Sequence, residues 1–144
     1  MSSVEERFSA ALHATARGWR LAVDRRLKDS GVSQAGWMTI AVVAKARSPL
    51  SQSELAQQVG VEGATMVSML DRLAAAGLIV RVPSASDRRV KRVQLTDAGN
   101  ALFDQVRGEA GAVRKALLAG IDPQVLLTAT QLLERLQGAL EDAV

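Results

Sequence analysis

The residues best suited to chemistry in this chain form a cluster of cations just past its middle. Residues 81–92 contain five cations and one acid, namely Arg81, Arg88, Arg89, Lys91, Arg92 and Asp87. Guanidinium and ammonium groups bind phosphate through charge-assisted hydrogen bonds, and arginine also enters narrow, A·T-rich minor grooves. The cluster therefore predicts contact with a polyanion such as a nucleic acid.

Charge is distributed unevenly along the sequence. The net charge of the 144 residues is only +3, which is a weak field when it is spread over a whole domain. Residues 45–96 hold eight Lys/Arg against four Asp/Glu, whereas residues 97–144 hold four against seven. The basic middle is therefore the part that we expect to meet nucleic acid.

Residues for catalysis or metal binding are scarce. The sequence has no cysteine, no tyrosine and one histidine, His13, so thiol chemistry and thiolate or histidine-rich metal sites are excluded. It has no Gly-rich phosphate loop and no serine elbow between a strand and a helix. Adjacent acids occur only near the two ends of the sequence, where paired carboxylates are usually solvated. We expect no enzyme activity, no cofactor and no metal.

Length and composition favour one domain. A chain of 144 residues, of which 48% are hydrophobic and 23% charged, has room for little more than one core. We find no basic n-region of a secretory signal and no uncharged apolar stretch of ~18 residues that could span a membrane. The sequence therefore predicts a cytoplasmic protein that makes no use of a membrane.

Two short helices with a tight turn between them are predicted ahead of the basic cluster. Ser51 and Glu54 form a capping box that starts a helix ending near Val59. Gly60 suits a left-handed turn, and residues 62–76 then form a second helix. The apolar residues expected on the inner face of that helix are Met66, Met69, Leu70 and Leu73. This spacing is typical of a helix-turn-helix, although an ordinary αα-hairpin has the same local pattern.

The basic cluster itself is predicted to lie on a β-hairpin. Residues 78–82 and 90–95 are strand-like, and the turn-rich residues 83–87 separate them. A charged strand can simply be a solvated face or a protected sheet edge. Directly after a helix-turn-helix, however, it favours the winged-helix arrangement.

Long amphipathic helices flank this winged part. Apolar residues spaced by three or four predict helices over residues 4–28, 34–46 and 97–119 and a last helix from Asp122-Pro123. The small winged core cannot cover both terminal helices, so a second copy of the chain is the natural partner for their apolar stripes. The expected interface residues are Phe8, Leu12, Leu126, Leu133, Leu136 and Leu140.

The basic hairpin also resembles a known family signature. Residues 87–99, DRRVKRVQLTDAG, are similar to the wing of the MarR family of bacterial transcription regulators, where Asp-x-Arg precedes a strand ending in Leu-Thr. Residues 70–73 and 77–79 match the end of the family's recognition helix and its first wing strand. Trp19-Arg20, Arg26-Leu27 and Gly36-Trp37 resemble the SlyA-type branch.

The resemblance implies a mainly α-helical, winged helix-turn-helix homodimer that binds a pseudo-palindromic operator in double-stranded DNA. Residues 1–144 would form a single MarR-type domain. Within it, residues 33–96 would be the DNA-binding part, and residues 1–32 and 97–144 would supply the dimerisation helices.

The expected DNA-binding residues lie on the helix-turn-helix and the wing. They are Ser51, Ser53, Ala64, Thr65, Ser68, Arg72, Arg88, Arg89, Lys91 and Arg92. Asp87 is expected to hold a wing arginine in position instead of touching DNA. SlyA-like members often carry arginine where this chain has Ser68 and proline where it has Ala64, so the sequence predicts no arginine–guanine contact at residue 68.

The predicted function is a sequence-specific transcription regulator that acts as a repressor. The resemblance also implies an effector, a small aromatic carboxylate held by Arg17, Arg20 and Trp37. Alternatively, these arginines are solvated and pair with neighbours such as Asp24, and Trp37 belongs to the core. The competing interpretation is a dimeric winged-helix adaptor that does not read DNA sequence.

Overall fold

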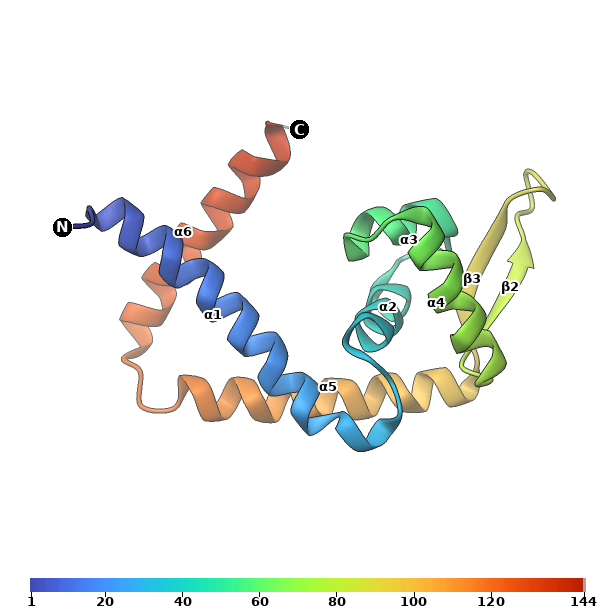
Figure 1. Cartoon of the computed structure of the whole chain (residues 1–144), viewed down its shortest axis with the longest axis horizontal. Helices are drawn as coiled ribbons and strands as arrows, with labels where there is room; N and C mark the ends of the chain where they lie inside the picture. Colours follow the sequence, from blue (N-terminus) through green and yellow to red (C-terminus); the bar gives the residue numbers. More distant parts are fainter. Residues whose placement is uncertain (144) are drawn as a thin grey trace. The chain divides into compact units, whose positions relative to one another are not determined.

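The computed structural model describes residues 1–143 and contains six α-helices, a 3₁₀ turn and three short strands in that part of the chain (Figure 1). The elements are α1 (Val4–Arg26), η1 (Lys28–Ser30), α2 (Gln34–Lys45), β1 (Leu50–Ser51), α3 (Gln52–Val59), α4 (Gly63–Ala75), β2 (Ile79–Pro83), β3 (Lys91–Leu95), α5 (Asp97–Leu118) and α6 (Pro123–Asp142). They form two compact units, Met1–Val113 and a second unit that begins at Arg114. The mainly helical winged fold predicted from the sequence is confirmed.

The helix-turn-helix forms for local reasons. The Ser51 hydroxyl accepts a hydrogen bond from the Glu54 amide at 3.2 Å, and the Glu54 carboxylate accepts one from the Ser51 amide at 3.3 Å. This capping box starts α3, and Gly60 ends it with a left-handed φ of 81°. Ala56 is buried on α3, which packs against both α2 and α4.

One core holds the winged part together. Leu55, Met66 and Leu70 have no exposed surface, and Ile40 from α2 and Val93 from β3 are buried with them. The stripe predicted for α4 therefore faces inward, and the other side of α4 faces solvent. This division decides which residues of α4 can meet DNA.

The sheet has three strands, not the two of the predicted hairpin. Its order is β1-β3-β2, all antiparallel, with Leu50 opposite Val93 and Ile79 opposite Leu95. Strand β1 was missed because it is two residues long, and such a segment shows no alternation of apolar and polar residues. Its pairing attaches the wing to the start of α3.

The C-terminal half of α1 packs on α5 within the first unit. Val23 and Leu27 share the core with Val106 and Val113, and Arg26 Nε lies 2.6 Å from Glu109 Oε2. In contrast, no residue of α6 is buried, although every third or fourth one is apolar. No single helix in residues 1–143 is long and apolar enough to cross a membrane, and only α5 and α6 taken together, with the break at residues 119–122, have the length and composition for it.

Candidate nucleic-acid interface

The outward side of α4 presents small side chains in its first two turns. Ala64, Thr65 and Ser68 are exposed, and so is Val67, of which 38% is accessible. Arg72, two turns from the start of the helix, is the first cation on this side and forms no ion pair with any of residues 1–143. The helix therefore offers methyl and hydroxyl groups first and a guanidinium only near its end.

The tip of the wing is organised by Asp87. Its Oδ1 atom accepts a hydrogen bond from the Arg89 amide at 3.0 Å and lies 3.3 Å from Arg89 Nε. The Arg89 side chain is nevertheless 93% exposed, and Arg88 and Lys91 are exposed as well. Asp87 thus holds the Arg89 backbone and the Nε edge of its guanidinium and leaves most of the side chain accessible.

The wing and the start of α3 enclose a hollow of about 270 Å³. Its lining includes four residues predicted from the sequence as DNA contacts, Ser51, Ser53, Arg89 and Lys91, together with Gln52 and Val90. The helix N-terminus contributes partial positive charge to the same place. Hydroxyls, a cation pair and a helix N-terminus are groups that bind phosphate.

An ion pair connects α3 to the wing. Arg92 Nη1 lies 2.8 Å from Glu54 Oε1, across 38 residues of sequence. Hydrogen bonds from Ser51, and in addition the nearby Arg92 guanidinium, hold the pKa of Glu54 below its usual value. Arg92 is therefore occupied within the fold, which reduces its freedom to contact phosphate.

A second ion pair connects α4 to the wing. Arg81 Nη2 on β2 lies 2.7 Å from Asp71 Oδ1 on α4. Only 26% of the Arg81 side chain is exposed, so this cation belongs to the body of the wing and not to its tip. The two pairs hold the hairpin against both helices of the helix-turn-helix.

Sequence reasoning missed this anchoring function of Glu54, Asp71 and Arg81. Glu54 was predicted only as half of a capping box, which is a local signal. Nothing local identifies a partner that lies 38 or 10 residues away in the sequence. Only the pairing of the strands brings these charges together.

The residues predicted for an effector site are only partly accessible. Arg17 and Arg20 are exposed on α1, and neither forms an ion pair with any residue in the described part of the chain, Asp24 included. Trp37 is half-buried against the core, and its Nε1 atom is buried without a hydrogen-bond acceptor among residues 1–143.

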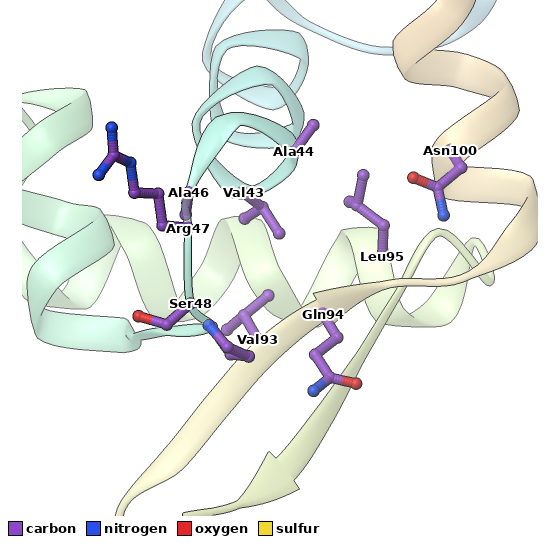
Figure 2. Close-up of a pocket in the computed structure, with 10 residues that line it drawn as sticks. Val43, Ala44, Ala46, Arg47, Ser48, Val93, Gln94, Leu95 and Asn100 are labelled. Carbon is purple, nitrogen blue, oxygen red and sulfur yellow. The ribbon is translucent and has the colours of Figure 1, made fainter.

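A separate hollow of about 230 Å³ lies between the end of α2, strand β3 and the first turn of α5. Figure 2 shows that the Arg47 guanidinium points away from the side on which the Gln94 and Asn100 amides lie. None of Arg17, Arg20 and Trp37 lines it. Its polar groups do not converge on one point, so it has no evident ligand.

The residues predicted for the dimer interface are accessible in the single chain. Phe8, Leu12, Leu133 and Leu140 are exposed by 40%, 38%, 43% and 68%, and Leu126 and Leu136 are half-buried. Exposed leucines at helical spacing are typical of faces that are covered by another chain.

The three-helix core α2 to α4, with a basic three-stranded wing beside the outward face of α4, defines a winged helix-turn-helix DNA-binding protein. The model for the MarR family matches residues 30–90. The chain also resembles the transcriptional regulator PA3341, with 40% identity and a TM-score of 0.85 over 94% of this chain and 98% of the other.

Two further solved structures share the fold at lower identity. CouR from Rhodococcus jostii RHA1, bound to p-coumaroyl-CoA, has 21% identity and a TM-score of 0.79 over 94% of this chain and 95% of its own. The transcriptional regulator SlyA has 18% identity and a TM-score of 0.81 over 94% of each chain. The chain belongs to the MarR family, and it is a DNA-binding transcription regulator, not an enzyme.

Proposed function

We propose that two copies of this chain bind a pseudo-palindromic operator, with α4 of each copy in a major groove and each wing tip in the flanking minor groove. The observation that carries this proposal is the arrangement at the wing, where Asp87 orients Arg89 and leaves 93% of its side chain exposed. A guanidinium presented in this way suits a narrow minor groove, where the negative potential is strongest. Exposed Arg88 joins Arg89 at the minor groove.

The remaining DNA contacts are of two kinds, contacts to base edges and contacts to phosphates. Ala64, Thr65 and Ser68 face the base edges, since they are exposed on the outward side of the first two turns of α4. The phosphate contacts come from Ser51, Ser53, Arg72 and Lys91 and set register rather than sequence. Arg92, which is held by Glu54, acts mainly by fixing the wing against α3.

The second copy binds through the terminal helices. Members of the family bind DNA as dimers. In this chain α6 has no buried residue, and its leucines are exposed or half-buried. This supports an interface formed by Phe8, Leu12, Leu126, Leu133, Leu136 and Leu140. Residues 33–96 would then bind DNA, and residues 1–32 and 97–144 would form the dimer.

We also propose that a small-molecule effector controls operator binding. Exposed Arg17 and Arg20 suit an aromatic carboxylate, because guanidinium forks bind carboxylates, and the indole face of half-buried Trp37 suits the aromatic ring. The related CouR structure contains p-coumaroyl-CoA, itself an aromatic acyl compound. Effector binding would weaken operator binding by favouring another separation of the two recognition helices, as expected of a cytoplasmic repressor.

The test is selection of genomic DNA fragments by the purified protein, followed by fluorescence anisotropy on the selected duplex and on a scrambled one. A regulator prefers the selected duplex by a factor of 10³ or more at physiological salt, as is typical of specific binding. Equal affinity for both duplexes, falling steeply with salt, would instead support the winged-helix adaptor.

A further inference from the structure

Val67 stands out on the DNA-facing side of α4. It is 38% exposed, and among residues 34–95 only Val80 on β2 is another exposed large apolar side chain. Single exposed valines are common on protein surfaces, so exposure alone does not indicate a binding residue. What distinguishes Val67 is its position in the second turn of the recognition helix, next to other small groups.

The neighbours of Val67 leave more than a third of its surface exposed. Ala64 lies one turn earlier on the same side of α4, and a Cβ built on Gly63 would have no neighbouring atom within 4 Å. The start of the helix is therefore both sterically open and apolar, and a base edge can approach it closely.

The hydrogen-bonding side chains that usually read bases are missing or engaged here. The exposed residues of the first two turns are Gly63, Ala64, Thr65, Val67 and Ser68, and none is an arginine, lysine, asparagine or glutamine. These four side chains make the two-point contacts that identify guanine and adenine. Asp71, which could accept from cytosine, has its Oδ1 atom paired with Arg81 at 2.7 Å.

The major groove contains one apolar group that matches this surface, the 5-methyl group of thymine. Resting on the DNA binding proposed above, we propose that Val67, together with Ala64, reads thymine in each half-site by packing against that methyl group. Val67 is thus a specificity-determining residue that the sequence reasoning did not include.

Uracil tests this directly, because it pairs as thymine does and lacks only the methyl group. In the selected operator each half-site thymine is replaced singly by deoxyuridine, and affinity is measured by anisotropy at fixed salt. The parent protein loses affinity roughly three- to tenfold at one or two positions, as expected for one buried methyl group.

The variants identify the residue responsible. Val67→Ala has almost the same affinity for the thymine and deoxyuridine operators, whereas Val80→Ala, a matched exposed valine outside the recognition helix, remains as sensitive as the parent. Alanine is a better helix former than valine, so Val67→Ala keeps α4 intact, and circular dichroism verifies the fold.

Different results would contradict the thymine contact of Val67 and the proposed operator binding. If deoxyuridine weakens binding at no position, or weakens binding of Val67→Ala as much as that of the parent, the thymine contact is overturned and operator binding still stands. If the parent selects no preferred sequence at all, the regulator proposal fails first and the thymine contact with it.

Discussion

The first turn of α5 packs directly on the backbone at the start of the wing, where a Cβ on Gly99 would overlap the carbonyl oxygen of Leu78. Thr96 reinforces the contact, since its amide donates to the Leu78 carbonyl at 3.1 Å and its hydroxyl donates to the Gly77 carbonyl at 2.6 Å. The Leu-Thr-Asp-Ala-Gly segment therefore joins the wing to α5 by backbone contact, and glycine is required for it.

Gly99→Ala should lower the unfolding free energy by roughly 1–3 kcal/mol, because backbone atoms must move to admit the methyl group. Gly108→Ala is the control, since nothing lies within 4 Å of a Cβ built there, and it should stabilise α5 by roughly 0.5–1 kcal/mol. Urea denaturation of both variants measures the difference. Equal stability of the two would show that the close approach of Gly99 to Leu78 is unimportant.

Arg89→Ala should weaken operator binding by roughly 1–3 kcal/mol if the guanidinium enters a groove. The fold and the dimer should be unaffected, because the side chain is almost fully exposed. Asp87→Asn is the companion variant, since it weakens the hold on Arg89 and should give a smaller loss. Anisotropy with an unchanged dissociation constant for Arg89→Ala would remove the wing from the interface.

The double variant Leu136→Glu, Leu140→Glu should be monomeric or insoluble. Charges on the apolar face of α6 must be desolvated if a second chain covers that face, and this desolvation opposes association. Two half-sites ~34 Å apart need two linked recognition helices, so DNA binding should fall as well. Sedimentation velocity decides the matter, and a soluble dimer of the double variant would place the interface elsewhere.

Salicylate and benzoate should release the parent protein from its operator, and Arg17→Ala and Arg20→Ala should respond less. The loss of affinity can be no larger than the ligand's preference for the DNA-free state over the DNA-bound state. Trp37→Phe replaces the indole face by a smaller ring and is the third variant to compare. Identical titrations for all four proteins would remove these residues from an effector site.

Glu54→Gln should loosen the wing in a pH-dependent manner. The pKa of Glu54 is lowered in the folded protein by Ser51 and Arg92, so its stabilising effect is present above its unfolded pKa of about 4.5 and is lost as the pH falls through the lower folded value. The difference in Tm between parent and variant should therefore be constant near neutrality and shrink in acid. A difference that grows on acidification would contradict the assigned pairing.

Much of the fold could be predicted because its signals are local. The capping box at Ser51 and Glu54, the left-handed glycine at 60 and the proline at the start of α6 each act within one turn of chain. The spacing of apolar residues likewise identified the inner face of α4, where Met66 and Leu70 have no exposed surface. The residues expected to face DNA are the ones on the opposite, exposed side of α4.

The sequence by itself determined where the helices start and stop, which side of α4 is buried, and that the cations cluster on a wing. Only the tertiary structure decided that Leu50-Ser51 is a third strand, that Arg92 is held by Glu54 and Arg81 by Asp71, and that Gly99 lies against Leu78. The physical reason is that caps and periodicity depend on neighbours within a few residues. Strand pairing and ion pairs between elements instead depend on which distant segments the buried core brings into contact.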